Sequence, residues 1–328
     1  MKQLWGSARL PLSLLVILHL AVALAGFLSP DDPARQNRTS ALLAPMGIHF
    51  LDARGKSHLR PFITVEGENR PIHFFVDGSP YTLLGLWTVR THLFGAGQPS
   101  GIHLMGTDEF GRDQFSRVLW GGQISLVTGW LAAVISVGLG MLLGLVAGYF
   151  GGWRDAIIMR SAELFLALPW LYLLLAVRAF LPLSLSPGAT ALALIAVIGV
   201  VGWARPARLV RGITLSVKER DYVYTARGFG ASSWYLLTRH CLPETYSVLA
   251  TQVALLIPQY ILAEVTLSFV GLGVGEPAPS WGNLLAPLRQ VSVLTSAWWM
   301  ALPALIVMLT SWCFLQLEDA LVNTSQWK

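Results

Sequence analysis

The segment Asp221–Glu244, DYVYTARGFGASSWYLLTRHCLPE, is polar, basic and helix-forming, and it lies between two long apolar segments. Gly230 interrupts the helical pattern, Ser232 is a residue type that caps a helix start, and Pro243 is expected to halt a helix. The pattern predicts a short helix, a glycine break and a second helix. A loop that only reverses the chain needs no such pattern, so the segment is interpreted as a docking element for a soluble partner.

The composition predicts an all-α integral membrane protein. Of the 328 residues, 54% are hydrophobic and 12% are charged, whereas soluble domains carry about 25% charged residues. The apolar residues occur in blocks of about 20, which suffices for a helix to cross a bilayer core of about 30 Å. The net charge of +5 is therefore no argument for nucleic acid, because Lys and Arg gather in the cytoplasmic loops of membrane proteins. Both cysteines fall in predicted cytoplasmic or membrane segments, which indicates no disulfide framework.

Six apolar spans are expected, at 11–28, 122–149, 157–180, 188–204, 246–271 and 297–317. The distribution of Lys and Arg predicts a cytoplasmic N-terminus, a cytoplasmic loop after the fourth span and a cytoplasmic C-terminus. The first span also fits a cleavable signal peptide, and the residues alone leave both readings open. The expected parts are an N-terminal helix at 1–28, an external insertion at 29–118, a five-helix core at 119–320 with the loop 205–243, and a tail at 321–328.

The insertion is expected to be a small folded unit, because it contains too many aromatic residues for a disordered segment. His73–Val76 and Tyr81–Leu86 have the pattern of short strands. Its histidines are scattered without the close pairing of a zinc site, so they are interpreted as ordinary loop residues.

Glycines recur every four residues in the second span and continue just beyond it, at Gly140, Gly144, Gly148 and Gly152. Four-residue spacing puts them on one face of a helix, where small residues let two membrane helices approach closely. The stripe indicates a compact bundle and carries no information about a substrate.

The segment Leu104–Arg117 precedes the second span. Thr107 or Asp108 is expected to cap a helix, and Asp113 and Arg117 are expected to pair at i, i+4. An alternative makes Asp108, Glu109 and Asp113 a metal or acid–base set, but no His or Cys stands at a matching spacing.

Two carboxylates fall within predicted spans, where ionisable groups are costly and usually face protein or water. Glu163 either pairs with Arg160 or lines a pathway, and the pair is favoured. Glu264 follows Pro258, which is expected to kink its helix, and is a candidate either for the pathway or for a contact with a partner subunit. Trp281 is expected to anchor an external turn at the membrane interface.

Taken together, residues 100–300 resemble the permease subunits of ABC importers, in the dipeptide/oligopeptide/nickel branch. The loop is similar to E-Y-V-x-A-A-R-x-x-G-A-S…R-H-x-L-P-N, and Ala263–Gly273 is similar to A-E-A-x-L-S-F-L-G-L-G. The resemblance implies a six-helix type I permease with an uncleaved first helix, in the bacterial cytoplasmic membrane. It also implies a second homologous permease, two ATPase subunits and an external binding protein, and no catalytic residue, cofactor or metal in this chain. The implied ATPase contacts are Tyr222, Tyr224, Thr225, Ala226, Arg227, Gly230, Ala231 and Ser232.

The chain departs from the family pattern at the docking loop. Tyr224 stands where the signature has glutamate and Thr225 where it has the first alanine, so a salt bridge from that glutamate to the ATPase is missing. The sequence contains no phosphate-binding loop, so ATP hydrolysis falls to another chain. The solute stays open between peptides, nickel and other small compounds. An ion-coupled secondary transporter is the alternative function, although such proteins more often show internal repeats.

Overall fold

The computed structural model describes the chain except residues 1, 52–56, 66–67, 84, 97–100, 183 and 326–328. Leu84 of the second predicted strand and the end of the predicted tail therefore lie outside the described residues. The chain divides into two compact units. Unit 1 comprises Met1–Ser13, Leu126–Glu264 and Thr310–Lys328, and unit 2 comprises Leu14–Ser125 and Val265–Leu309.

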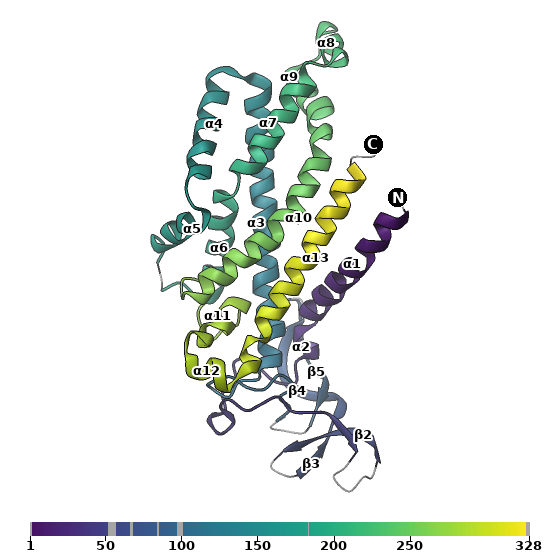
Figure 1. Ribbon diagram of the computed structural model, residues 1–328, viewed down its shortest axis with the longest axis vertical. Coiled ribbons are helices and arrows are strands. Elements are labelled where there is room, and N and C mark those ends of the chain that lie inside the picture. The colour runs from purple at the N-terminus through teal and green to yellow at the C-terminus, as the bar shows by residue number, and fades with distance from the viewer. Residues whose placement is uncertain are drawn as a thin grey trace. The chain divides into compact units, whose positions relative to one another are not determined.

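Helices dominate the described chain, as the apolar blocks predict (Figure 1). In the described residues, four helical stretches are long and apolar enough to cross a membrane. They are α3 (Gln114–Phe150), α6 (Pro187–Val201) with α7 (Ala204–Lys218), α9 (Ser233–Leu236) through α10 (Leu242–Phe269), and Trp298–Val322, which contains most of α13 (Leu302–Ser325).

The expected span at 157–180 is not a single helix in the structure. The chain forms α4 (Gly152–Ala167) and α5 (Trp170–Ala179), which meet at 97°. Pro169 lacks an amide hydrogen and disfavours the helical conformation at the residue before it, and Leu168 accordingly has φ −85° and ψ 138°. The bent pair counts as a fifth span if its two helices cross together.

The N-terminal region forms α1 (Lys2–Ala23) and the short α2 (Ala25–Leu28). The apolar part of α1, Ala8–Ala23, is shorter than the stretch of about 20 residues that a bilayer crossing requires. The described residues therefore contain four or five candidate spans, and the expected total of six remains a prediction.

One core cluster of unit 1 lies between α4 and α7, which run side by side in Figure 1. Ala162 of α4 packs with Trp203, Ala204 and Ala207, and the ring of Phe165 meets the indole of Trp203 edge-on at 5.8 Å. A bidentate ion pair between Arg211 of α7 and Asp155 of α4 also joins the two helices. Arg211 Nε lies 2.5 Å from Asp155 Oδ1, and Arg211 Nη2 lies 2.6 Å from Asp155 Oδ2.

The glycine stripe of α3 faces α7, as the spacing predicts. A Cβ placed on Gly140 would lie 2.5 Å from Pro206 Cβ, one on Gly144 2.6 Å from the carbonyl oxygen of Ala207, and one on Gly148 2.7 Å from Thr214 Cβ. The predicted fourth member, Gly152, is not part of this contact. It has φ +59° and no atom within 4 Å of an added Cβ, because α3 ends at Phe150 and Gly152 begins α4.

Unit 2 includes residues 29–118, where a small folded insertion is expected, and the strands lie in this part. Strands β1 (His49–Leu51), β2 (Ser57–Val65) and β3 (Glu68–Pro71) form an antiparallel sheet in that order, and β4 (His73–Leu83) pairs with β5 (Trp87–Gly95). Both predicted strand segments lie in the single strand β4, apart from Leu84 outside the described residues and the turn residues Gly85 and Leu86, and β5 was not predicted. The short helices are η1 (Arg38–Ser40), α11 (Trp281–Leu285), η3 (Ala286–Arg289), α12 (Val291–Ser296) and η4 (Trp298–Ala301).

One histidine fastens this hairpin to the end of α2. His92 is buried, and its Nδ1 and Nε2 lie 2.6 Å and 2.9 Å from the carbonyl oxygens of Ser29 and Ser79. The sequence predicts an ordinary loop residue at His92. In the structure, His92 instead connects the β4–β5 hairpin to the end of α2.

Candidate functional site

The docking segment, residues 219–236, has the predicted helix–glycine–helix form. Its first helix, α8 (Asp221–Gly228), ends where Gly230 adopts φ +86° and the amide of Ala231 donates to the carbonyl of Ala226. The six-residue closure with a left-handed glycine is a common helix ending. Ser232 then caps α9, because its side chain accepts a hydrogen bond from the amide of Tyr235.

Pro243 does not halt the second helix, contrary to the sequence expectation. A π turn at Leu237–Cys241 follows α9 directly, and α10 begins at Leu242 and continues past the proline. Proline lacks an amide hydrogen and crowds the carbonyl four residues before it. The wider π turn accommodates both, so the docking segment passes without a gap into a long apolar helix.

The surface of the docking segment is aromatic and exposed. Val223 is fully buried, whereas Phe229 is 89% exposed and Trp234 is 74% exposed. Of the predicted contacts, Tyr222, Tyr224, Thr225, Arg227, Gly230 and Ser232 are exposed, and Ala226 and Ala231 are half-buried. Phe229 and Trp234 are not among the predicted contacts, although large aromatic residues beside a glycine break in a polar segment are a usable signal. Exposed aromatic and arginine side chains are typical of protein interfaces.

The docking segment is tied to its neighbours at its first residues. Arg220 donates to the hydroxyl of Tyr222 at 3.4 Å and to Glu244 at 3.2 Å, which links the start of α8 to the start of α10. The bond to Tyr222 and then the charge of Glu244 raise the pKa of Arg220. Lys218 Nζ donates to the carbonyl of Gly148 at 3.2 Å, which holds the end of α7 to α3. The start of α8 is thus linked to α10, and the end of α7 is linked to α3.

The three residues predicted for a pathway or gate occupy different environments. Glu264 of α10 is fully buried, and α10 continues through Pro258 without ending there. The side chain of Glu163 is 54% exposed, and its Oε2 lies 3.0 Å from Arg160 Nη1. The expected Arg160–Glu163 pair is confirmed. A pathway role stays a prediction for all three residues.

A cavity of about 220 Å³ in unit 1 lies where α5, the α6–α7 junction and α10 meet. The indole of Trp170 stacks on the ring of Tyr260 at 5.8 Å, and the Tyr260 hydroxyl donates to Ser136 Oγ at 2.8 Å. Arg205 and Gln259 supply further polar side chains. Most of the other lining residues are apolar, and Leu168 and Trp170 on either side of Pro169 are among them. The cavity therefore depends on the bend at Pro169, which the apolar pattern of this span does not reveal.

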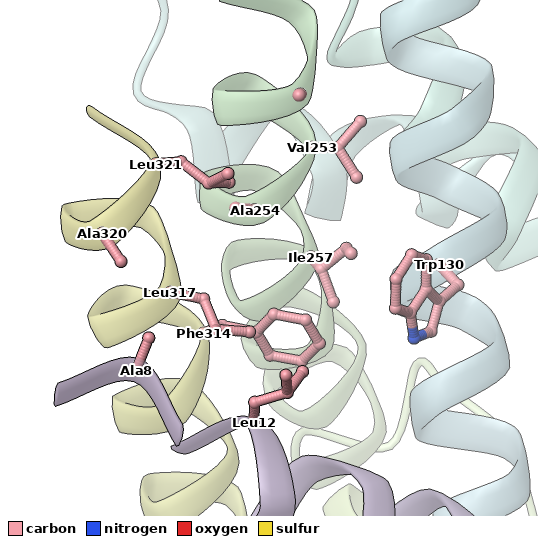
Figure 2. A pocket seen from close by; sticks show the side chains of 11 residues that line it. Ala8, Leu12, Trp130, Val253, Ala254, Ile257, Phe314, Leu317, Ala320 and Leu321 are labelled. Carbon is pink, nitrogen blue, oxygen red and sulfur yellow. The ribbon is translucent and has the colours of Figure 1, made fainter. Parts of the chain in front are cut away.

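A second recess in unit 1, of about 300 Å³, is lined by apolar side chains (Figure 2). Figure 2 shows Trp130 of α3 and Phe314 of α13 pointing into it, and their rings meet edge-on at 6.0 Å. Leu12 of α1 and Ile257 of α10 complete the wall that the figure displays. A recess of this composition suits hydrocarbon and offers little to a polar solute.

The segment Leu104–Arg117 belongs to unit 2 and is bonded differently from the sequence expectation. Asp113, rather than Thr107 or Asp108, caps α3, because its Oδ2 accepts from the amide of Ser116 at 2.7 Å. The predicted Asp113–Arg117 pair is wrong. The Asp113 carboxylate accepts from the amide of Ser116, and its Oδ1 lies 3.1 Å from Nδ1 of His103. The guanidinium of Arg117 donates to Glu276 instead.

Trp281 is not an exposed interfacial anchor. It is fully buried in unit 2, and its indole Nε1 donates to the carbonyl of Val118 at 3.0 Å. Ser280 and Asn283 form a reciprocal capping box at the start of α11, which fixes the tryptophan in place. The aromatic side chain is therefore part of the packing against α3.

Comparison with known proteins identifies the fold family. Residues 140–323 match the binding-protein-dependent transport system inner membrane component family. The chain belongs to this family. The permease is 38% identical over 224 residues to a dipeptide transport system permease protein of Bacillus subtilis, which covers 68% of each chain. A glutathione transport system permease protein of Pectobacterium atrosepticum is also 38% identical, over 68% of this chain and 72% of that one. An oligopeptide transport system permease protein of Haemophilus influenzae is 37% identical, over 67% and 69%.

The matched region of the permease runs from the middle of α3 to α13 and contains the docking segment, Glu163 and Glu264. The β-strands precede it. The permease is therefore a multi-pass membrane component of a transport system, and its β-strands lie outside the part that defines the family.

Proposed function

We propose that this permease forms half of the translocation pathway of an ATP-driven peptide importer in the cytoplasmic membrane of a bacterium. The exposed docking segment carries the proposal, because Phe229 and Trp234 present large apolar surfaces at the end of a polar helix pair. Peptides are the proposed solutes, since the relatives described above transport dipeptides, oligopeptides and glutathione.

The proposed arrangement has six crossings with both termini in the cytoplasm. Helix α1 is the first crossing, and the bent pair α4–α5 is the third. The expected division of the chain is retained, with a first helix at 1–28, an external insertion at 29–118, a core at 119–320 with the cytoplasmic loop 205–243, and a tail at 321–328. A second homologous permease completes the pathway, two ATPase subunits bind from the cytoplasm, and an external binding protein delivers the solute.

Coupling proceeds through the docking segment. When the ATPase subunits bind ATP and close, α8 moves with the groove that holds it. Because α8 follows α7 and Arg220 bonds Glu244 at the start of α10, the movement reaches both helices. Glu264 and the cavity beside Tyr260 are the proposed lining of the pathway. The permease itself performs no catalytic step, and ATP is hydrolysed by the ATPase subunits.

Two tryptophan variants test the docking assignment. Trp234 in the docking segment is 74% exposed, and Trp87 in the hairpin is 61% exposed, so each can be replaced by alanine with little loss of internal packing. The tagged chain is purified in detergent from its native membrane, and its partners are identified by mass spectrometry. We expect Trp234→Ala to lose the ATPase subunits while retaining the second permease, and Trp87→Ala to retain both. Equal recovery of the ATPase subunits with both variants would contradict the docking assignment.

Uptake in vesicles tests the energy source. The purified complex is placed in proteoliposomes with the binding protein outside and a labelled dipeptide as solute. Uptake is expected to require ATP inside the vesicles and to persist when ionophores remove all ion gradients. Uptake that needs an ion gradient and no ATP would favour a secondary transporter.

A further inference from the structure

Two buried arginines in unit 2 hold one carboxylate. The side chains of Arg112 and Arg117 are 4% and 1% exposed. Arg112 grips Glu276 with both terminal nitrogens, at 2.5 Å and 3.1 Å, and Arg117 Nη2 lies 2.9 Å and 3.1 Å from the two Glu276 oxygens. The Glu276 carboxylate therefore accepts four charge-assisted hydrogen bonds.

The charges of this cluster balance only while Glu276 is in place. Within the described residues, both arginines form ion pairs with the same two carboxylates, Asp108 and Glu276. Asp108 is as buried as the arginines, at 5%, whereas the Glu276 side chain is 46% exposed. Burial by itself lowers the pKa of Arg112, but the bonds to Glu276 and Asp108 outweigh it and raise the pKa. Two buried positive charges are therefore neutralised by one buried carboxylate, Asp108, and by one solvent-accessible carboxylate, Glu276.

Glu276 belongs to a short connection between α10 and α11, next to a large cavity. The cavity has about 600 Å³ and is lined by Arg112 and Glu276 together with Glu109, Phe110, Arg289 and Gln290. Small-molecule sites commonly have volumes of about 300–1,000 Å³. A molecule in the cavity therefore lies beside both the guanidinium of Arg112 and the carboxylate that neutralises it.

We propose that Arg112 and Arg117 form a carboxylate-binding site that opens on this cavity, and that Glu276 is its built-in, exchangeable occupant. The ligand class is a small molecule with a free carboxylate, and the C-terminus of a peptide is the example that rests on the proposed function. A ligand carboxylate replaces the four hydrogen bonds of Glu276 and frees the connection between α10 and α11. No covalent step is involved.

Removing the built-in occupant tests the site directly. Among the described carboxylates, the variant Glu276→Ala leaves both guanidinium groups with Asp108 alone, so its unfolding midpoint in detergent is expected to fall. Added acetate should restore it, because a ligand that binds only the folded state stabilises that state. At a concentration one hundred times its dissociation constant, acetate should raise the folded-to-unfolded ratio about 100-fold. Acetamide and sodium chloride at equal concentration should not.

Glu109→Ala is the matched control, since Glu109 lines the same cavity and forms no ion pair with either arginine in the described contacts. At the acetate concentration that restores Glu276→Ala, this variant should show much weaker acetate-specific stabilisation, because Glu276 still occupies its site and must be displaced. A Glu276→Ala protein that responds equally to acetate, acetamide and chloride would show that the arginine pair is not an accessible carboxylate site.

The wild-type chain gives a second readout that does not depend on the folding of a variant. Acetate or a dipeptide at high concentration should displace Glu276 and increase amide hydrogen exchange in residues 271–276, and the C-terminal amide of the same dipeptide should not. Unchanged exchange with every carboxylate would overturn the proposal. These measurements use the solubilised chain and need neither ATPase nor transport, so their failure leaves the proposed importer function standing.

Discussion

Replacing Gly144 by alanine tests the close contact between α3 and α7. An added Cβ would lie 2.6 Å from the carbonyl oxygen of Ala207 and 2.7 Å from Val210 Cβ. Neither atom is the end of a flexible side chain, so the two helices must move apart to admit the methyl group. Association of membrane helices depends on such close packing, because lipid offers apolar surface equally well.

The structure supplies both a magnitude and a control. Overpacking of a well-packed contact typically costs about 1–3 kcal/mol. Gly138 lies on the same helix with no atom within 4 Å of an added Cβ, and glycine-to-alanine replacement in a helix interior contributes about 1 kcal/mol of stability. Both variants gain this contribution, so Gly144→Ala and Gly138→Ala should differ by the overpacking cost alone, about 1–3 kcal/mol, with Gly144→Ala the less stable.

The chain contains its own reporters of unfolding. Cys241 and Cys313 are free and buried, so a thiol-reactive fluorescent dye reports unfolding in detergent as the thiols become accessible. The midpoint temperature is measured for the wild type and both variants. If Gly144→Ala unfolds at the same temperature as Gly138→Ala, the helices do not approach as closely as described and the packing argument fails.

Three further variants probe other local contacts. Asp155→Asn removes the charged acceptor of Arg211 and should lower the thermal midpoint by the equivalent of roughly 1–3 kcal/mol, and an unchanged midpoint would refute a structural role for the pair. Ser280→Ala breaks the capping box with Asn283 and should cost about 0.5–2 kcal/mol. It should be seen as faster amide exchange in the first turn of α11, whereas wild-type exchange rates would count against the cap. Gly230→Ala imposes strain of about 1–2 kcal/mol at φ +86° but meets no atom within 4 Å. We expect it to fold and to recover less ATPase subunit in pull-downs, and full recovery would exclude a requirement for the helix ending.

Local features of the docking segment followed from the sequence because their causes are local. Ser232 caps the start of α9 and Gly230 ends α8 through bonds to residues only a few positions away in the chain. The exposure of Phe229 and Trp234 did not follow, since it depends on which face of α8 and α9 the rest of unit 1 covers. The effect of Pro243 was misjudged, because a π turn just before it removed the conflict that normally ends a helix.

The arginine–glutamate contacts of unit 2 could not be predicted from the sequence, because the residues are far apart along the chain. Glu276 is 164 residues from Arg112 and 159 residues from Arg117, so spacing gives no sign that they meet. The nearby Asp113 looked like the natural partner of Arg117, but its carboxylate was already committed to the start of α3. Tryptophan is common at membrane interfaces, which favours an anchoring role for Trp281 when only the sequence is considered. Its burial is instead decided by the packing of α11 against α3.

The π turn at Leu237–Cys241 also determines which way the docking aromatic residues point. A π turn contains one residue more than an α turn, and each residue of an α-helix advances about 100° around the axis. Side chains from Leu242 onward are therefore rotated by about that angle from where an unbroken helix starting at Ser233 would put them. The angle about the helix axis between Trp234 and the buried Glu264 therefore depends on the one additional residue in the π turn. Removing a single residue from this turn would rotate Trp234 relative to Glu264 while leaving both residues chemically intact.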